Sequence, residues 1–240
     1  MLKISSKKAN LSLVVAASIL GIIAVIVVVS RPEVNSTSST VTNIAQAGSE
    51  AQTFQVLKSP TVSEDDKVFG RPDAPLKIFV YEDYSNLFSA TLADNLDKAV
   101  IEFGDDIAIF VRPFVKNSEV AYAAAAAINC AGDQGKWQEM RALLFAKVKS
   151  KQPFEPSSLE YVNQLGLQEN DFSACLTNEK KSGRIEGVTT EAEAFAVYGA
   201  PTIFIGEEMI PGARPYDDYV DSEGVGVYGL QTIIAKKLGK

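Results

Sequence analysis

The sequence predicts an α/β domain that follows a single apolar segment of membrane-spanning length. Two runs rich in β-branched and aromatic residues, Leu76–Tyr81 and Ile107–Val115, alternate with segments whose apolar residues recur at helical spacing. This β-α-β order favours parallel strands joined by crossover helices. The apolar segment, residues 11–30, contains no charged residue.

The composition excludes several classes of function. The 240 residues carry a formal charge of −7 and no His. Nucleic-acid binding needs clustered Lys and Arg, so we expect no nucleic-acid partner. The absence of His removes Ser-His-Asp and Cys-His catalysis and the commonest zinc ligand. We therefore expect neither a metal nor a cofactor.

The amino-terminal part divides into three pieces. Residues 1–10 are predicted to be a cytoplasmic terminus, residues 11–30 a transmembrane anchor and residues 31–58 a flexible linker. About twenty apolar residues span a bilayer, whereas the apolar core of a cleaved signal peptide is shorter. Three lysines before the span place the amino terminus in the cytoplasm by the positive-inside rule. The membrane is thus a predicted partner, and the domain at residues 59–240 is predicted to be extracytoplasmic.

A short polar turn connects the first strand to a helix predicted over residues 87–100. A helix start offers free backbone N–H groups and the positive end of the helix dipole. Ser85 or Asn86 is predicted to cap this helix. Glu82 and Asp83 are expected to interact favourably with the dipole rather than to form a catalytic acid pair.

The rest of the domain is predicted to be mainly helical, with a closing strand pair. The helical patterns are Ser118–Ala131, Pro156–Leu165, Asn170–Asn178, Gly183–Tyr198 and Leu230–Leu238, and the strands are Thr202–Ile205 and Met209–Ile210.

Three blocks resemble DsbA-type thioredoxin-fold proteins, in the same order along the chain. In Gly70–Ser89, a Gly-x-Pro-x-Ala-Pro lead-in and an Asp-aromatic turn resemble the family's approach to Cys-x-x-Cys at a helix start. Cys130–Phe145 is similar to a segment of the family's helical insertion, and Gly199–Tyr219 to its cis-proline loop and closing hairpin. The resemblance begins near Val68 and implies a thioredoxin fold with a helical insertion at about residues 117–181.

The chain departs from the family at the reactive positions. Asn86 and Ser89 stand where the family has its two cysteines, with Leu87 and Phe88 between them. Val80 stands where the family often has a buried glutamate. The resemblance therefore implies an intact scaffold without its dithiol chemistry, and we assign no catalytic residue.

The resemblance also implies a groove between this turn and the proline loop, with Pro201 in the cis position. Backbone pairing in such a groove needs no thiol, so a chaperone-like module that binds extended peptides or unfolded protein segments is the first hypothesis. The residues expected to bind peptide are Tyr84, Ser85, Asn86, Leu87, Phe88, Ala200 and Pro201.

Cys130 and Cys175 are the only cysteines, and each lies in a helical segment. Oxidising surroundings favour a disulfide, and some members of the resembling family have a structural bridge at positions like these. Two unrelated buried thiols are the alternative. Two enzyme hypotheses also stay open: a thiol-disulfide oxidoreductase working through Cys130 and Cys175, and an enzyme resembling the kappa-type glutathione transferases that uses Ser89.

Overall fold

The computed structural model describes residues 59–240, except for the side chains of residues 179–183. The predicted anchor at residues 11–30 and the predicted linker lie outside the described residues. Within the described part of the chain, no helix is both long enough and apolar enough to span a membrane.

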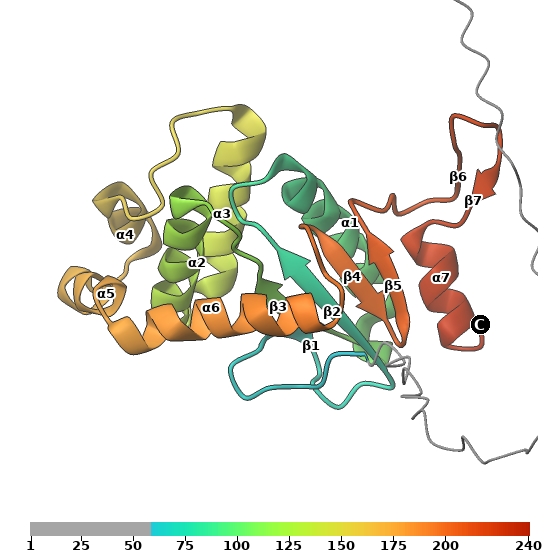
Figure 1. The fold of residues 1–240 in the computed structure, drawn as a ribbon, viewed down its shortest axis with the longest axis horizontal. Coiled ribbons are helices and arrows are strands. Elements are labelled where there is room, and N and C mark those ends of the chain that lie inside the picture. Colours follow the sequence, from blue (N-terminus) through green and yellow to red (C-terminus); the bar gives the residue numbers. More distant parts are fainter. Residues whose placement is uncertain (1–58) are drawn as a thin grey trace, which may run out of the picture. The chain divides into compact units, whose positions relative to one another are not determined.

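Five strands form the central sheet in the order β1-β3-β2-β4-β5 (Figure 1). The strands are β1 (Lys67–Gly70), β2 (Leu76–Glu82), β3 (Ile107–Pro113), β4 (Thr202–Ile205) and β5 (Glu208–Pro211). β2 and β3 are parallel to each other. The other three neighbouring pairs, β1 with β3, β2 with β4 and β4 with β5, are antiparallel. The predicted β-α-β order is confirmed, and the strand after Pro201 lies beside the first predicted strand.

Strand alternation divides the side chains of the sheet between two cores. Ile78 and Val80 enter the larger core, and Phe79 and Tyr81 enter the smaller one. The helices that contribute to the larger core include α1 (Leu87–Phe103), α2 (Glu119–Gly132), α3 (Trp137–Ser150), α4 (Leu159–Leu165), α5 (Glu169–Leu176) and α7 (Leu230–Lys237). α6 (Glu179–Ala194) runs across the other face of the sheet, where Ala192 joins the smaller core (Figure 1).

The helical insertion predicted between the two halves of the fold is formed by α2 to α5. α2 buries its small side chains, including Ala121, Ala124 and Ala127, and this lets neighbouring elements approach its backbone closely. The helix predicted at Gly183–Tyr198 is instead α6, which lies further toward the amino terminus. It ends where Ala196 takes a positive φ of 60° and the Val197 N–H donates back to the Ala192 carbonyl.

Two features were not predicted: β1, and a separate hairpin of β6 (Tyr219–Val220) and β7 (Gly226–Val227). The turn expected at Gly104–Asp106 is present as a short 3-10 turn between α1 and β3. The last residue of β1, Gly70, has a φ of 81°, and a Cβ there would lie 2.5 Å from the carbonyl oxygen of Ile107. The lead-in glycine is therefore required by the close approach of β1 to the start of β3.

Candidate functional site

The sheet register brings the polar turn and the proline loop to one end of the molecule. Tyr81 on β2 pairs with Thr202 on β4, so the turn that follows β2 lies beside the loop that precedes β4. The Ala200–Pro201 peptide bond is cis, as predicted. The parallel pairing of Glu82 with Pro113 brings the exit of β3 to the same end.

Asn86 caps α1 and occupies the donors at the helix start. Its backbone is extended, and its Oδ1 atom accepts hydrogen bonds from the N–H groups of Phe88 at 2.7 Å and Ser89 at 3.3 Å. These are the N–H groups that would otherwise be free to stabilise an anion at this turn. Of the two predicted capping residues, Asn86 is thus the one that caps, through its side-chain amide oxygen.

Ser85 and Asp83 form a small hydrogen-bonded turn instead. The Asp83 carboxylate accepts from both the N–H and the hydroxyl of Ser85, at 2.8 and 2.6 Å. The Asp83 N–H in turn donates to the Ser89 hydroxyl oxygen at 3.2 Å. Ser89 is fully buried, so its hydroxyl fastens the turn from inside the protein and is closed to solvent.

The predicted peptide-binding residues differ in how far they reach the surface. Leu87 and Phe88 are exposed, Ser85, Asn86 and Ala200 are half-buried, and Pro201 is buried. Tyr84 is also buried, and its ring packs against Phe145 with the ring centres 5.8 Å apart. The side chain of Tyr84 therefore supports the turn from the core and does not line an open surface. Tyr198, which was not predicted, is 74% exposed just before the proline loop.

A buried ion pair lies directly behind the turn, where none was predicted. Arg141 on α3 donates two hydrogen bonds to the Glu82 carboxylate, at 2.8 and 2.6 Å, and both side chains are buried. Burial acts to lower the pKa of Arg141, but the adjacent Glu82 carboxylate outweighs it and the pKa is raised. The guanidinium also lies over the rings of Phe69 and Phe145. Glu82 therefore pairs with Arg141 and is not the dipole partner that was expected.

The sequence contains one signal for this pair. Glu82 shares the alternation of Ile78 and Val80, which places it on a buried face. A carboxylate on such a face needs a partner, since an isolated buried charge is costly. The partner itself, 59 residues away, carries no local signal.

A second buried arginine anchors the start of the domain. Arg112 on β3 donates two hydrogen bonds to Asp66, at 2.6 and 2.8 Å, and others to Glu191 and the hydroxyl of Tyr81. Burial raises the pKa of Tyr81 to about 12, although Arg112 opposes that rise. A cleft of about 530 Å³ lies beside this cluster, between β1, β3, α2 and α6. The cleft lies at the β1 side of the sheet, whereas the polar turn follows β2, the strand next to β4.

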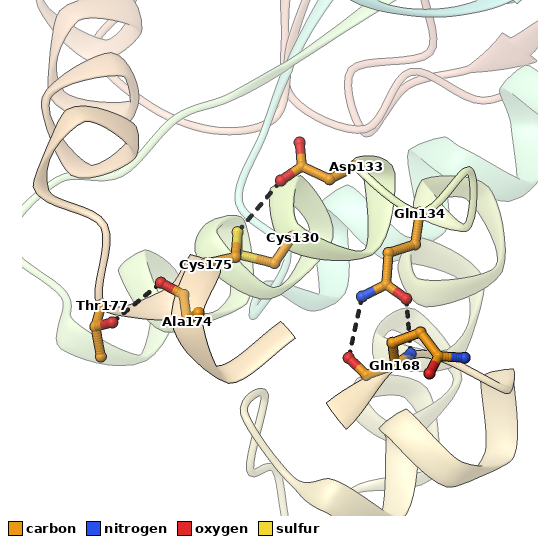
Figure 2. Close-up of a disulfide and its surroundings, with 7 residues drawn as sticks. All are labelled: Cys130, Asp133, Gln134, Gln168, Ala174, Cys175 and Thr177. Carbon is orange, nitrogen blue, oxygen red and sulfur yellow. Dashed lines mark hydrogen bonds between the residues drawn. A yellow bond between two sulfur atoms is a disulfide. The ribbon is translucent and has the colours of Figure 1, made fainter. Parts of the chain in front are cut away.

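Cys130 and Cys175 form the expected disulfide, with a Cα–Cα distance of 5.7 Å (Figure 2). Cys130 lies near the carboxyl end of α2 and Cys175 near the carboxyl end of α5. The Asp133 carboxylate lies 3.5 Å from the sulfur of Cys175. Both a helix carboxyl end and a neighbouring carboxylate disfavour a thiolate, which is the reactive form of cysteine.

The described residues contain no group of three or more His, Cys, Asp and Glu side chains arranged to hold a metal ion.

Comparison with known proteins assigns the chain to a family. A family model described as Thioredoxin matches residues 40–221. The chain belongs to the thioredoxin family. Its architecture is that of the DsbA-like thiol-disulfide oxidoreductases, as the resemblance of its motifs implied.

Two solved structures show the shared fold. BdbD from Bacillus subtilis superposes with a TM-score of 0.61 at 17% identity, covering 76% of this chain and 97% of BdbD. Alpha-DsbA1 from Wolbachia pipientis superposes with a TM-score of 0.56 at 18% identity, covering 74% of this chain and 93% of that one.

Among curated proteins, the chain is 27% identical over 163 residues to a Na(+)/H(+) antiporter NhaA 1 from Mycolicibacterium gilvum. The match covers 67% of this chain and 26% of the antiporter, so the chain spans about a quarter of the length of this relative.

Proposed function

We propose that this protein is a DsbA-like module that is redox-inactive at the usual site and binds extended peptide or unfolded protein segments. One observation carries the first half of the proposal. The Asn86 amide oxygen occupies the N–H groups of Phe88 and Ser89, where an active member would present a thiolate. The turn keeps the N-terminus of α1, but its free N–H groups are bonded to the neutral, unreactive side-chain amide of Asn86.

The backbone beside the turn supports peptide binding. Neither the N–H nor the C=O of Ala200 has a hydrogen-bond partner among the described residues. The neighbouring Pro201 carbonyl, by contrast, accepts from the Gly212 N–H at 2.8 Å. Ala200 therefore leaves one donor and one acceptor for an added extended strand, and such pairing needs no sulfur chemistry.

Exposed apolar side chains at the same end would supply the rest of the contact. Phe88 is 66% exposed, Leu87 is exposed beside it, and the exposed Tyr198 comes just before the proline loop in the chain. Val120, at the start of α2, is a further exposed apolar residue beyond the exit of β3. Exposed apolar side chains gathered at one site indicate an interaction surface.

The proposal includes the location of the module. An anchor at residues 11–30, with the amino terminus in the cytoplasm, would hold the domain outside the membrane on a linker at residues 31–58. The Cys130–Cys175 disulfide supports this placement, because disulfides persist mainly in oxidising compartments.

Neither enzyme hypothesis has a specific observation in its favour. Cys130 and Cys175 lie at the carboxyl ends of helices beside Asp133, which disfavours a reactive thiolate. Ser89 is buried, and its hydroxyl is engaged by the backbone of Asp83.

Three measurements on the purified protein test the proposal. Insulin reduction and dithiol oxidation should both be absent, and reduced, carboxymethylated lactalbumin, a permanently unfolded protein, should bind. Phe88→Lys and Tyr198→Lys should each weaken this binding. Ile101→Lys, an equal change at an exposed apolar position on the same helix α1, is the matched control. Redox activity that is lost on Cys130→Ser would instead support the oxidoreductase hypothesis and overturn the proposal.

A further inference from the structure

The hairpin of β6 and β7 forms a separate two-stranded sheet outside the central sheet. Its two strands pair only with each other among the described strands. Its base is fastened where it meets α7: the Gly229 N–H donates to the Asp218 carboxylate at 2.8 Å, and the Leu230 N–H to the Pro215 carbonyl at 2.9 Å. Figure 1 shows the hairpin next to α7, at the end of the chain beyond β5. An isolated two-stranded hairpin is marginally stable, so these bonds hold the hairpin in place.

One face of the hairpin is apolar and hollow. Val220 is 67% exposed and lies opposite Gly226 in the register. Tyr228, 55% exposed, follows β7 and lines the same hollow, and the Lys236 ammonium on α7 lies 3.2 Å from the centre of its ring. A Cβ on Gly226 would meet no atom within 4 Å. The residues around Gly226 accordingly line a hollow of about 380 Å³.

The hairpin's own charged side chains are all acidic, although Arg214 and Lys236, from outside it, lie over the rings of Tyr219 and Tyr228. Residues 217–228 carry four carboxylates and no basic side chain. Asp218 and Asp221 serve the hairpin itself, because they accept hydrogen bonds from the N–H groups of Gly229 and Val225. Asp217 and Glu223 are exposed at its base and its tip. This charge disfavours a second copy of the same hairpin and an anionic membrane surface as occupants.

We propose that the hairpin docks an extended segment of another protein in which apolar and basic side chains alternate. The segment adds as a strand along the open edge of the hairpin. Its apolar side chains enter the hollow at Gly226, between Val220 and Tyr228. Its basic side chains lie against Asp217 and Glu223. This surface is separate from the proposed peptide site at the Asn86 turn.

A labelled peptide of alternating Lys and Val, mixed with the full-length protein in detergent, tests the proposal by fluorescence anisotropy. Gly226→Leu fills the hollow without backbone strain, since Gly226 does not have a positive φ, and should weaken binding about tenfold or more. Val220→Lys should do the same, while Ile101→Lys, at an exposed position outside both proposed sites, should leave binding unchanged. Asp217→Asn with Glu223→Gln should weaken binding and reduce its dependence on salt.

Four results would overturn the proposal. The peptide could fail to bind the wild-type protein, or it could bind Gly226→Leu and Val220→Lys as tightly as wild type. A matched peptide of alternating Glu and Val could bind equally well, which would exclude charge complementarity. Sedimentation could show self-association that Gly226→Leu abolishes, which would assign the surface to a second copy of the chain.

Discussion

Arg141 on α3 holds the Glu82 carboxylate at the end of β2 through two hydrogen bonds, and both side chains are buried. The pair joins the helical insertion to the strand that leads into the polar turn. Because both charges are buried, the contact is sensitive to the loss of either partner: the remaining charge would be buried without compensation.

Arg141→Met should therefore destabilise the protein by about 3–5 kcal/mol. Glu82→Leu combined with Arg141→Met should be closer to wild type, because no charge is then left unpaired. The free energy of unfolding in urea measures both effects. Lys149→Met, also on α3, breaks an exposed pair with Asp94 and should cost about 1 kcal/mol or less. Equal losses for Arg141→Met and Lys149→Met would refute the structural role of the pair.

The disulfide should stabilise the insertion without contributing to binding. Cys130→Ala with Cys175→Ala should lower the free energy of unfolding by about 4 kcal/mol, from the chain entropy of the 45-residue separation. Thermal unfolding with and without dithiothreitol should show the same loss in the wild-type protein. Binding of unfolded lactalbumin should persist in the double variant at temperatures where it is folded. Two thiols that titrate in the denatured, unreduced protein would show that the bridge does not form.

Stability should fall at alkaline pH partly through Tyr81. Burial raises its pKa to about 12 in the folded protein, from about 10 in an unfolded chain. The folded-state pKa is the higher one, so this contribution is fully present below about pH 10 and is lost as the pH rises toward 12, at about 1.4 kcal/mol per pH unit. Tyr81→Phe should make the fall shallower in urea unfolding over this range. A pH profile of Tyr81→Phe identical to that of the wild-type protein would contradict the assignment.

Local patterns predicted the parts of the site that local chemistry determines. The Asn86 cap follows from a polar residue placed between a strand and a helical period, and the proline loop and the disulfide agree with the motifs that surround them. The pairs of Glu82 with Arg141 and of Arg112 with Asp66 could not be predicted in the same way. Each pair joins two segments that are distant in the sequence and meet only in the folded protein. The periodicity of either segment does not indicate which residue of the other one it contacts. The β6–β7 hairpin was missed because strands of two residues are too short to show alternation.

The polar turn itself can be tested by restoring its sulfurs. In Asn86→Cys with Ser89→Cys, the thiol at position 86 would lie where the amide oxygen now accepts from the N–H groups of residues 88 and 89. Those groups and the dipole of α1 belong to the backbone and remain after the substitution, so they should stabilise the thiolate. The pKa of that thiol should therefore lie well below the free value of about 8.5.

Alkylation rates measured against pH give this pKa. A thiol introduced at Thr91, exposed on the same helix but one turn inside it, is the reference and should titrate near the free value. Recovery of insulin reduction should be only partial, because Val80 cannot carry a proton and the nearby Glu82 is held by Arg141. A residue-86 thiol whose pKa equals that of the Thr91→Cys reference would mean that the helix start no longer favours an anion. In that case the turn would have lost more than its cysteines, and the likeness to DsbA-like proteins would describe the fold alone.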